Sequence, residues 1–123
     1  MFTVICLFRV KQKDLDEFIE LTRKSGNLLK SHGALDHNIY FSNKLTGSQG
    51  SMGLLNVVDV EEDEELMLGQ SIFKSEEHYH EIMKTAGFDD IIQYLDDHIK
   101  DVVESTRIIT SSFTTERSKE LEA

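Results

Sequence analysis

Residues Phe88–Val103 (FDDIIQYLDDHIKDVV), with the segment Arg107–Phe113 (RIITSSF) behind them, decide the fold class. A helix over the first segment places its apolar residues on one stripe: Phe88, Ile91, Ile92, Leu95, Ile99, Val102 and Val103. The second segment is rich in β-branched residues, which predicts a strand. The sequence therefore predicts a helix followed by a strand of a sheet at this end of the chain.

The amino-terminal end has the opposite order. Phe2–Val10 is rich in β-branched and aromatic residues and predicts a strand, and Leu15–Lys30 is amphipathic and predicts a helix. Asp14 and Glu17 have the spacing of a capping box at the start of this helix. Gly33 predicts its end, because glycine adopts the left-handed conformation that commonly follows a helix.

Turn signals divide the middle of the chain into further segments. They predict a strand over Ala34–Ser42, a polar loop over Asn43–Gly53, a strand over Gly53–Val60, a strand or short helix over Leu66–Phe73, and a short helix from Ser75 to Lys84. Gly69 and the acidic turn before it favour a strand in the ambiguous segment. The whole predicts one α+β domain over residues 1–113, with a ferredoxin-like antiparallel sheet and helices on one face. A frayed tail is expected over 114–123.

Charge and composition exclude several function classes. The 123 residues carry a net charge of −10, and their basic residues are scattered singly. Such a surface repels phosphate backbones, so nucleic acid is not an expected partner. Cys6 is the one cysteine, which rules out an intramolecular disulfide.

The apolar start of the chain does not read as a membrane or export signal. It is too short to span a membrane, and its basic residues, Arg9 and Lys11, follow the apolar run instead of preceding it. We therefore expect a cytoplasmic protein without a membrane partner.

Several predicted strands are apolar on both faces, which predicts a homodimer. In the first strand Val4, Cys6 and Phe8 oppose Ile5 and Leu7, and the predicted strand Gly53–Val60 shows the same pattern. Right-handed connections send both helices of a ferredoxin-like sheet to the same side. The same face of a second copy is the simplest cover for the other side.

Three segments resemble the dimeric α+β barrel superfamily, and in particular its antibiotic biosynthesis monooxygenase-like branch. They are MFTVICLFRVKQKDLDEFIEL, HGALDHNIYFSN and FKSEEHYHEIM, and RIITSSFTT is similar to uncharacterised families of the superfamily. The resemblance implies ferredoxin-like subunits paired through their sheets, with a pocket between sheet and helices. That branch usually has tryptophan where this chain has Phe73 and histidine where it has Ile82, so residues associated with oxygenase or haem-degrading chemistry are missing.

The densest group of titratable residues lies at the start of the predicted helix after Ser75: Glu77, His78, His80 and Glu81. One helix supplies about two metal ligands, so a metal site would need others, such as His37 or His98. The simpler interpretation is a solvated, charged helix start, and we expect no metal site. Cys6 lies among apolar residues in a strand, which favours an inert core thiol over a nucleophile.

Polar residues on otherwise apolar strands are the better candidates for a pocket. His37 and Asn56 are the first choices, since burial would demand a partner or a ligand. Arg9 and Asp59 lie near predicted strand ends, where solvent explains them. The candidate pocket-lining set is thus His37, Asn56, Phe73, His78 and His80, with the catalytic residues unknown. The glycine-rich loop GSQGSMG is expected to be a hairpin loop that could act as a flap.

Two functions remain open. The first is a homodimer that binds a small hydrophobic organic molecule, and that oxidises or isomerises it in a monooxygenase-like way without a tightly bound cofactor. This reaction class rests on analogy with the superfamily. The second is a non-catalytic dimeric binding or interaction module whose polar residues are structural.

Overall fold

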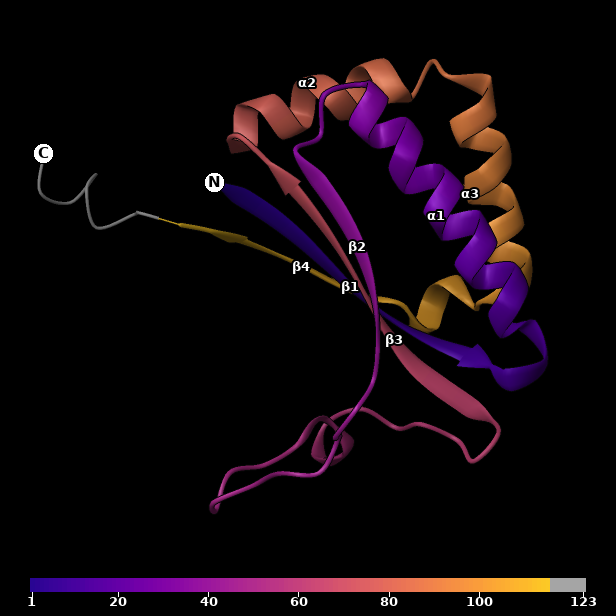
Figure 1. Cartoon of the computed structure of the whole chain (residues 1–123), viewed down its shortest axis with the longest axis vertical. Helices are drawn as coiled ribbons and strands as arrows, with labels where there is room; N and C mark the ends of the chain where they lie inside the picture. The colour runs from indigo at the N-terminus through magenta and orange to yellow at the C-terminus, as the bar shows by residue number, and fades with distance from the viewer. Residues whose placement is uncertain (116–123) are drawn as a thin grey trace, which may run out of the picture.

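The computed structural model describes residues 1–115, which form a four-stranded antiparallel sheet with three helices on one face (Figure 1). The strands are β1 (Phe2–Lys11), β2 (Asp36–Phe41), β3 (Glu64–Phe73) and β4 (Ile109–Thr114), in the order β2-β3-β1-β4. The helices are α1 (Leu15–Ser31), α2 (Glu76–Ala86) and α3 (Asp90–Val102). This is the predicted ferredoxin-like α+β fold. Residues 116–123, most of the tail expected to be frayed, lie outside the described residues.

The core lies between the sheet and the helices, in two clusters. One contains Phe2, Ala34, Phe73 and Ile82, and the other contains Val10, Phe18, Met67 and Val103. The even-numbered residues of β1 face these helices, since Phe2, Val4, Phe8 and Val10 all pack in the clusters. The odd-numbered residues therefore face the opposite, outer side of the sheet, because side chains alternate along a strand.

The predicted strand over Gly53–Val60 is wrong. Residues 42–63 form a long connection that contains a short 3-10 turn at Leu54–Asn56, and Figure 1 shows it extending beyond one end of the sheet. The physical reason is pairing: all ten residues of β3 pair with β1 and six of them pair with β2, so β3 holds the position between β1 and β2 that the predicted strand would have filled. The ambiguous segment Leu66–Phe73 is thus the third strand, not the fourth.

The helix ends follow local sequence signals, with two exceptions. Gly33 has a φ of +118°, and its N–H and that of Ala34 bond to the carbonyls of Lys30 and Leu29, which ends α1 as predicted. The Ser75 hydroxyl accepts a hydrogen bond from the His78 N–H, as expected of a cap. The capping box predicted at Asp14 does not form, because a 3-10 turn over Gln12–Asp14 leads directly into α1.

The other exception is the start of α3. Asp89 accepts hydrogen bonds from the N–H groups of Ile91 and Ile92, so the helix begins at Asp90. Phe88 therefore precedes the helix and is 82% exposed, and Ile91 also faces outward. The buried stripe is narrower than predicted and centres on Ile92, Leu95 and the neighbouring Ile99.

A buried ion pair joins the start of β3 to the segment before β4. The Arg107 guanidinium donates two hydrogen bonds to Glu64, at 2.6 and 3.1 Å, and the Glu64 side chain is 1% exposed. Glu64 also accepts a bond from the Glu61 N–H, and Arg9 donates to the carbonyls of Asp59 and Arg107. Arg107 is the main reason that the pKa of Glu64 falls to about 2. Arg9 is thus partly buried and bonded to backbone carbonyls, whereas the sequence predicted that solvent alone would accommodate it.

None of the helices within residues 1–115 is long and apolar enough to cross a membrane.

The Glu64–Arg107 pair predicts a specific loss of stability in acid. The folded-state pKa of Glu64, about 2, lies below its usual value of 4.5, so its contribution is fully present above pH 4.5 and is lost as the pH falls toward 2. We expect Glu64→Gln to lower the free energy of unfolding by about 3 kcal/mol at pH 7 and to flatten its decline below pH 4.5. Urea unfolding between pH 7 and pH 2.5 measures both effects.

Glu20→Gln is the matched control, because Glu20 pairs with Arg23 and Lys24 at the surface. It should change stability much less than Glu64→Gln does, because solvent screens this exposed pair. Equal effects of the two substitutions would show that the buried pair is not the acid-sensitive contact.

Candidate functional site

The structure separates the five predicted pocket residues instead of gathering them. His37 lies on the helix-facing side of β2, opposite Ser71 of β3. Phe73 is part of the core, where its ring packs against Tyr79. Asn56 is exposed in the long connection, where its side chain accepts a bond from the Gly53 N–H and shapes a local turn.

The two histidines of α2 do not form a common site. His80 is exposed and lies 3.6 Å from Glu76, one turn away on the same helix. The Nδ1 atom of His78 is buried and has no hydrogen-bond partner among residues 1–115. Within the same described residues, no three His, Cys, Asp or Glu side chains come together in a group that could hold a metal ion.

The absence of a side chain at Gly26 of α1 leaves the space that the His37 ring occupies. A Cβ atom at Gly26 would lie 2.0 Å from the His37 Cδ2 atom, so the imidazole ring packs directly against the helix backbone. Its Nδ1 atom lies 2.9 Å from the Ser71 hydroxyl, while its Nε2 atom is buried and without a partner among the described residues. Burial is the main reason that the pKa of His37 is lowered, which favours the neutral ring at pH 7.

His37 forms part of the wall of a pocket between α1, α3 and the sheet, which we call the helix-side pocket. Its volume is about 250 Å³. Its lining is mostly apolar, and the lining residues are Phe8, Thr22, Ser25, His37, Ile39, Asp96, Ile99, Lys100 and Ile108. This is where the superfamily resemblance placed a pocket, and of the predicted residues only His37 lies in it.

The pocket also contains a carboxyl group that sequence reasoning missed. Asp96 follows Leu95 on the buried stripe of α3 and is half-buried, and burial raises the pKa of its carboxyl group. The signal was present in the sequence, because Asp96 is spaced four residues from Ile92 and three from Ile99, on one side of the helix. A carboxylate among such residues needs a partner or a ligand.

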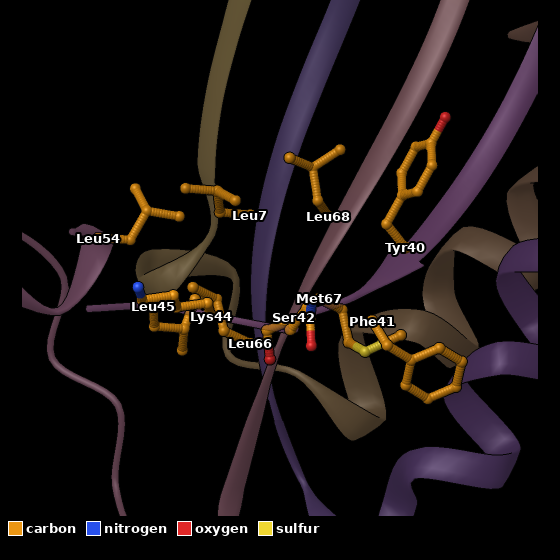
Figure 2. A pocket seen from close by; sticks show the side chains of 11 residues that line it. Leu7, Tyr40, Phe41, Ser42, Lys44, Leu45, Leu54, Leu66, Met67 and Leu68 are labelled. Carbon is orange, nitrogen blue, oxygen red and sulfur yellow. The ribbon is translucent and has the colours of Figure 1, made fainter. Parts of the chain in front are cut away.

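The outer side of the sheet is a second, larger apolar surface, which we call the open face. The strand register aligns Ile109, Leu7, Leu68 and Tyr40 in one row across all four strands. Figure 2 shows Leu7, Leu68 and Tyr40 side by side, with Leu45 and Leu54 of the long connection nearby. Together they line a groove of about 370 Å³. No helix covers this face within residues 1–115 (Figure 1).

The four-stranded sheet and the helices on one side of it define the class: a ferredoxin-like α+β protein. The chain belongs to the family described as "Protein of unknown function (DUF1428)", whose model matches residues 1–101. No curated protein matches the sequence.

Known structures share the fold at low sequence identity. At3g17210 from Arabidopsis thaliana is 11% identical with a TM-score of 0.63, over 94% of this chain and 96% of that one. An antibiotic biosynthesis monooxygenase is 10% identical with a TM-score of 0.59, over 94% and 99%. A dimeric ferredoxin-like protein from an uncultured marine organism is 14% identical with a TM-score of 0.55, over 94% and 89%. At such identities the likeness establishes the fold alone.

The contact between Gly26 and His37 predicts an unusual response to alanine. In a helix interior, Gly→Ala normally stabilises by up to about 1 kcal/mol. Here the new methyl group would overlap the His37 ring, so we expect Gly26→Ala to destabilise the fold by about 1–3 kcal/mol. Chemical denaturation of the single variants and of the double variant with His37→Ala measures the coupling.

In the double variant the alanine at position 26 should no longer be destabilising, because the ring that it meets is gone. Asn27→Ala, at the next and exposed position of α1, is the control and should be nearly neutral. Additive effects of Gly26→Ala and His37→Ala would contradict the contact.

Proposed function

We propose that the chain acts as a homodimer joined through its open face, and that each subunit binds a small apolar organic molecule in the helix-side pocket. The observation that carries the proposal is the division of the sheet into two unlike sides. One side is covered by helices and contains a pocket with buried polar groups. The other is apolar and uncovered within the described chain.

The composition of the open face supports a second copy as its cover. Tyr40, Ile109 and Phe113 are 48%, 38% and 58% exposed, and Ile5, Leu7 and Leu68 fill the space between them. Exposed apolar patches of this extent mark interaction sites. The row next to that of Leu68 contains Asn38, Gln70 and Ser111 beside Ile5. The open face is thus apolar in part and also carries polar side chains, as other protein interfaces do.

The size of the open face is sufficient for a stable dimer. Strands about 4.8 Å apart, with about 3.3 Å per residue, give four strands a face of roughly 20 by 25 Å, or ~500 Å². About half of this area is apolar, and burying ~250 Å² of apolar surface on each subunit contributes on the order of 6 kcal/mol per subunit, or ~12 kcal/mol for the dimer, before the costs of association. The ferredoxin-like protein from an uncultured marine organism, which shares this fold, is named as dimeric, and this is consistent with the proposed arrangement.

A charge on the open face should therefore break the dimer. We expect the wild-type chain to sediment at twice its 14.1 kDa mass, and Leu68→Glu to sediment as a monomer, because two carboxylates would be buried at the centre of the contact. Ile109→Glu, at a more exposed position of the same row, should weaken the dimer without affecting the core. Sedimentation velocity gives the masses, and circular dichroism verifies folding.

Ile91→Glu is the matched control for charge and residue size. Ile91 is 60% exposed on α3, on the helix side, so its replacement should leave the dimer intact. A wild-type chain that is monomeric at high concentration, or a dimer lost only in Ile91→Glu, would disprove the proposed interface.

The helix-side pocket suits a ligand of about one ring. A 150 Å³ apolar cavity accepts benzene, so about 250 Å³ accommodates a ring with a short substituent. Phe8, Ile39, Ile99 and Ile108 supply the apolar wall, and Ser25 is buried beside them on α1. An apolar wall with few polar groups is typical of small-molecule sites.

Ser25→Leu tests this pocket by filling it. Ligand-observed NMR with 2-phenylethanol, indole and cyclohexanol should detect binding to the wild type and no binding to Ser25→Leu, because the leucine side chain occupies the site. Lys24→Leu adds the same side chain at the neighbouring exposed position and should retain binding. If no compound binds, or if Ser25→Leu binds as well as the wild type, the non-catalytic dimer is the correct alternative.

A further inference from the structure

Two polar groups of the helix-side pocket lack a partner within the described residues: the buried Nε2 atom of His37 and the carboxyl group of Asp96. Asp96 is half-buried, and no hydrogen bond or ion pair joins its carboxyl group to another residue of the part of the chain that is described. Thr22, by contrast, donates to the carbonyls of its own helix, and the other ring nitrogen of His37 bonds to Ser71. The Asp96 carboxylate is therefore free to bind a molecule that enters the pocket.

The surroundings of Asp96 select the charge of that molecule. Most of the exposed wall surface is apolar, and the chain carries a net charge of −10, so at long range a cation is attracted and a carboxylate or phosphate is repelled. At the site Asp96 and Lys100 carry opposite charges, and Asp96 is the group that attracts a cation. The phenyl ring of Phe8 also lines the pocket, and aromatic faces attract ammonium groups.

We propose that the ligand of the helix-side pocket is a small aromatic or alicyclic amine, whose ammonium group pairs with Asp96 while its ring fills the apolar part of the pocket. This inference rests on the proposed function, since it names the ligand class of the same pocket. A ring with an aminoethyl substituent matches the volume, and its ammonium group makes a charge-assisted hydrogen bond with the carboxylate.

Lys100 competes with such a ligand. It also lines the pocket, one helical turn from Asp96, and this i, i+4 spacing lets the two side chains attract each other. The Lys100 side chain is exposed and lies beyond ion-pair distance of Asp96, so a pairing with the ligand does not require a salt bridge to break. Removing Lys100 should strengthen amine binding.

Three probes of nearly equal shape separate charge from apolar fit: 2-phenylethylamine, 2-phenylethanol and 3-phenylpropionate. We expect the full-length chain at pH 7 to bind the amine at least tenfold more tightly than the alcohol, and to bind the acid most weakly. Titration followed by NMR or calorimetry gives the dissociation constants. Asp96→Asn should remove the preference for the amine, with a smaller loss of affinity for 2-phenylethanol, whose hydroxyl group can still donate to the asparagine side chain. Lys100→Gln should increase the affinity for the amine.

Asp97→Asn is the matched control. Asp97 is the neighbouring, exposed residue of α3, and its replacement removes one negative charge as Asp96→Asn does, so the two variants have the same net charge. A loss of amine preference in Asp96→Asn alone supports the proposal. An equal loss in both variants would mean that overall charge causes the preference, and would overturn it.

The remaining outcomes distinguish this inference from the function on which it rests. If the amine and the alcohol bind equally, and Ser25→Leu abolishes both, the pocket is a binding site and the assignment of Asp96 is wrong. If none of the three probes binds to the wild type, the amine inference is overturned together with the proposed small-molecule function.

Discussion

The long antiparallel pairing of β1 with β3 is the contact on which the rest of the structure depends. The two strands bond over ten residues each, from Phe2 opposite Phe73 to Lys11 opposite Glu64. They form the centre of the sheet, so β2 and β4 can only join at its edges. Their alternation sends one set of side chains toward the helices and the other toward the open face, and both proposed contacts of the protein follow from that division.

The helix layer closes one side through a few specific contacts. Asp89 caps α3 and also lies 2.8 Å from His32 at the end of α1, which joins the two helices that border the pocket. Gly26 brings α1 close enough for the His37 ring to pack against its backbone. At the opposite end, Glu64 and Arg107 connect β3 to the segment before β4. The helix-side pocket lies between α1, α3 and the sheet, and Asp96 is one of its lining residues.

The same geometry makes the two sides of the sheet unequal in function. The helix side has a pocket in which a few polar side chains lie among apolar ones, which is typical of small-molecule binding sites. The open face has an uncovered apolar row beside polar residues, which is typical of a protein–protein contact. The long connection 42–63 contributes Leu45 and Leu54 to the open face, so it belongs to the surface where a second subunit would pack.

The sequence by itself determined the elements whose signals are local. The β-branched run of β1, the amphipathic pattern of α1, the glycine after it and the serine before α2 all act through neighbouring residues, and each was predictable from the pattern. The run Gly53–Val60 is also rich in residues that favour strands but forms no strand, because Glu64–Phe73 pairs with β1 and β2 in its place. Only the tertiary structure decided that Gly26 contacts His37 and that His37 and Asp96 line the same pocket. These depend on contacts between residues far apart in the chain, which local periodicity does not encode.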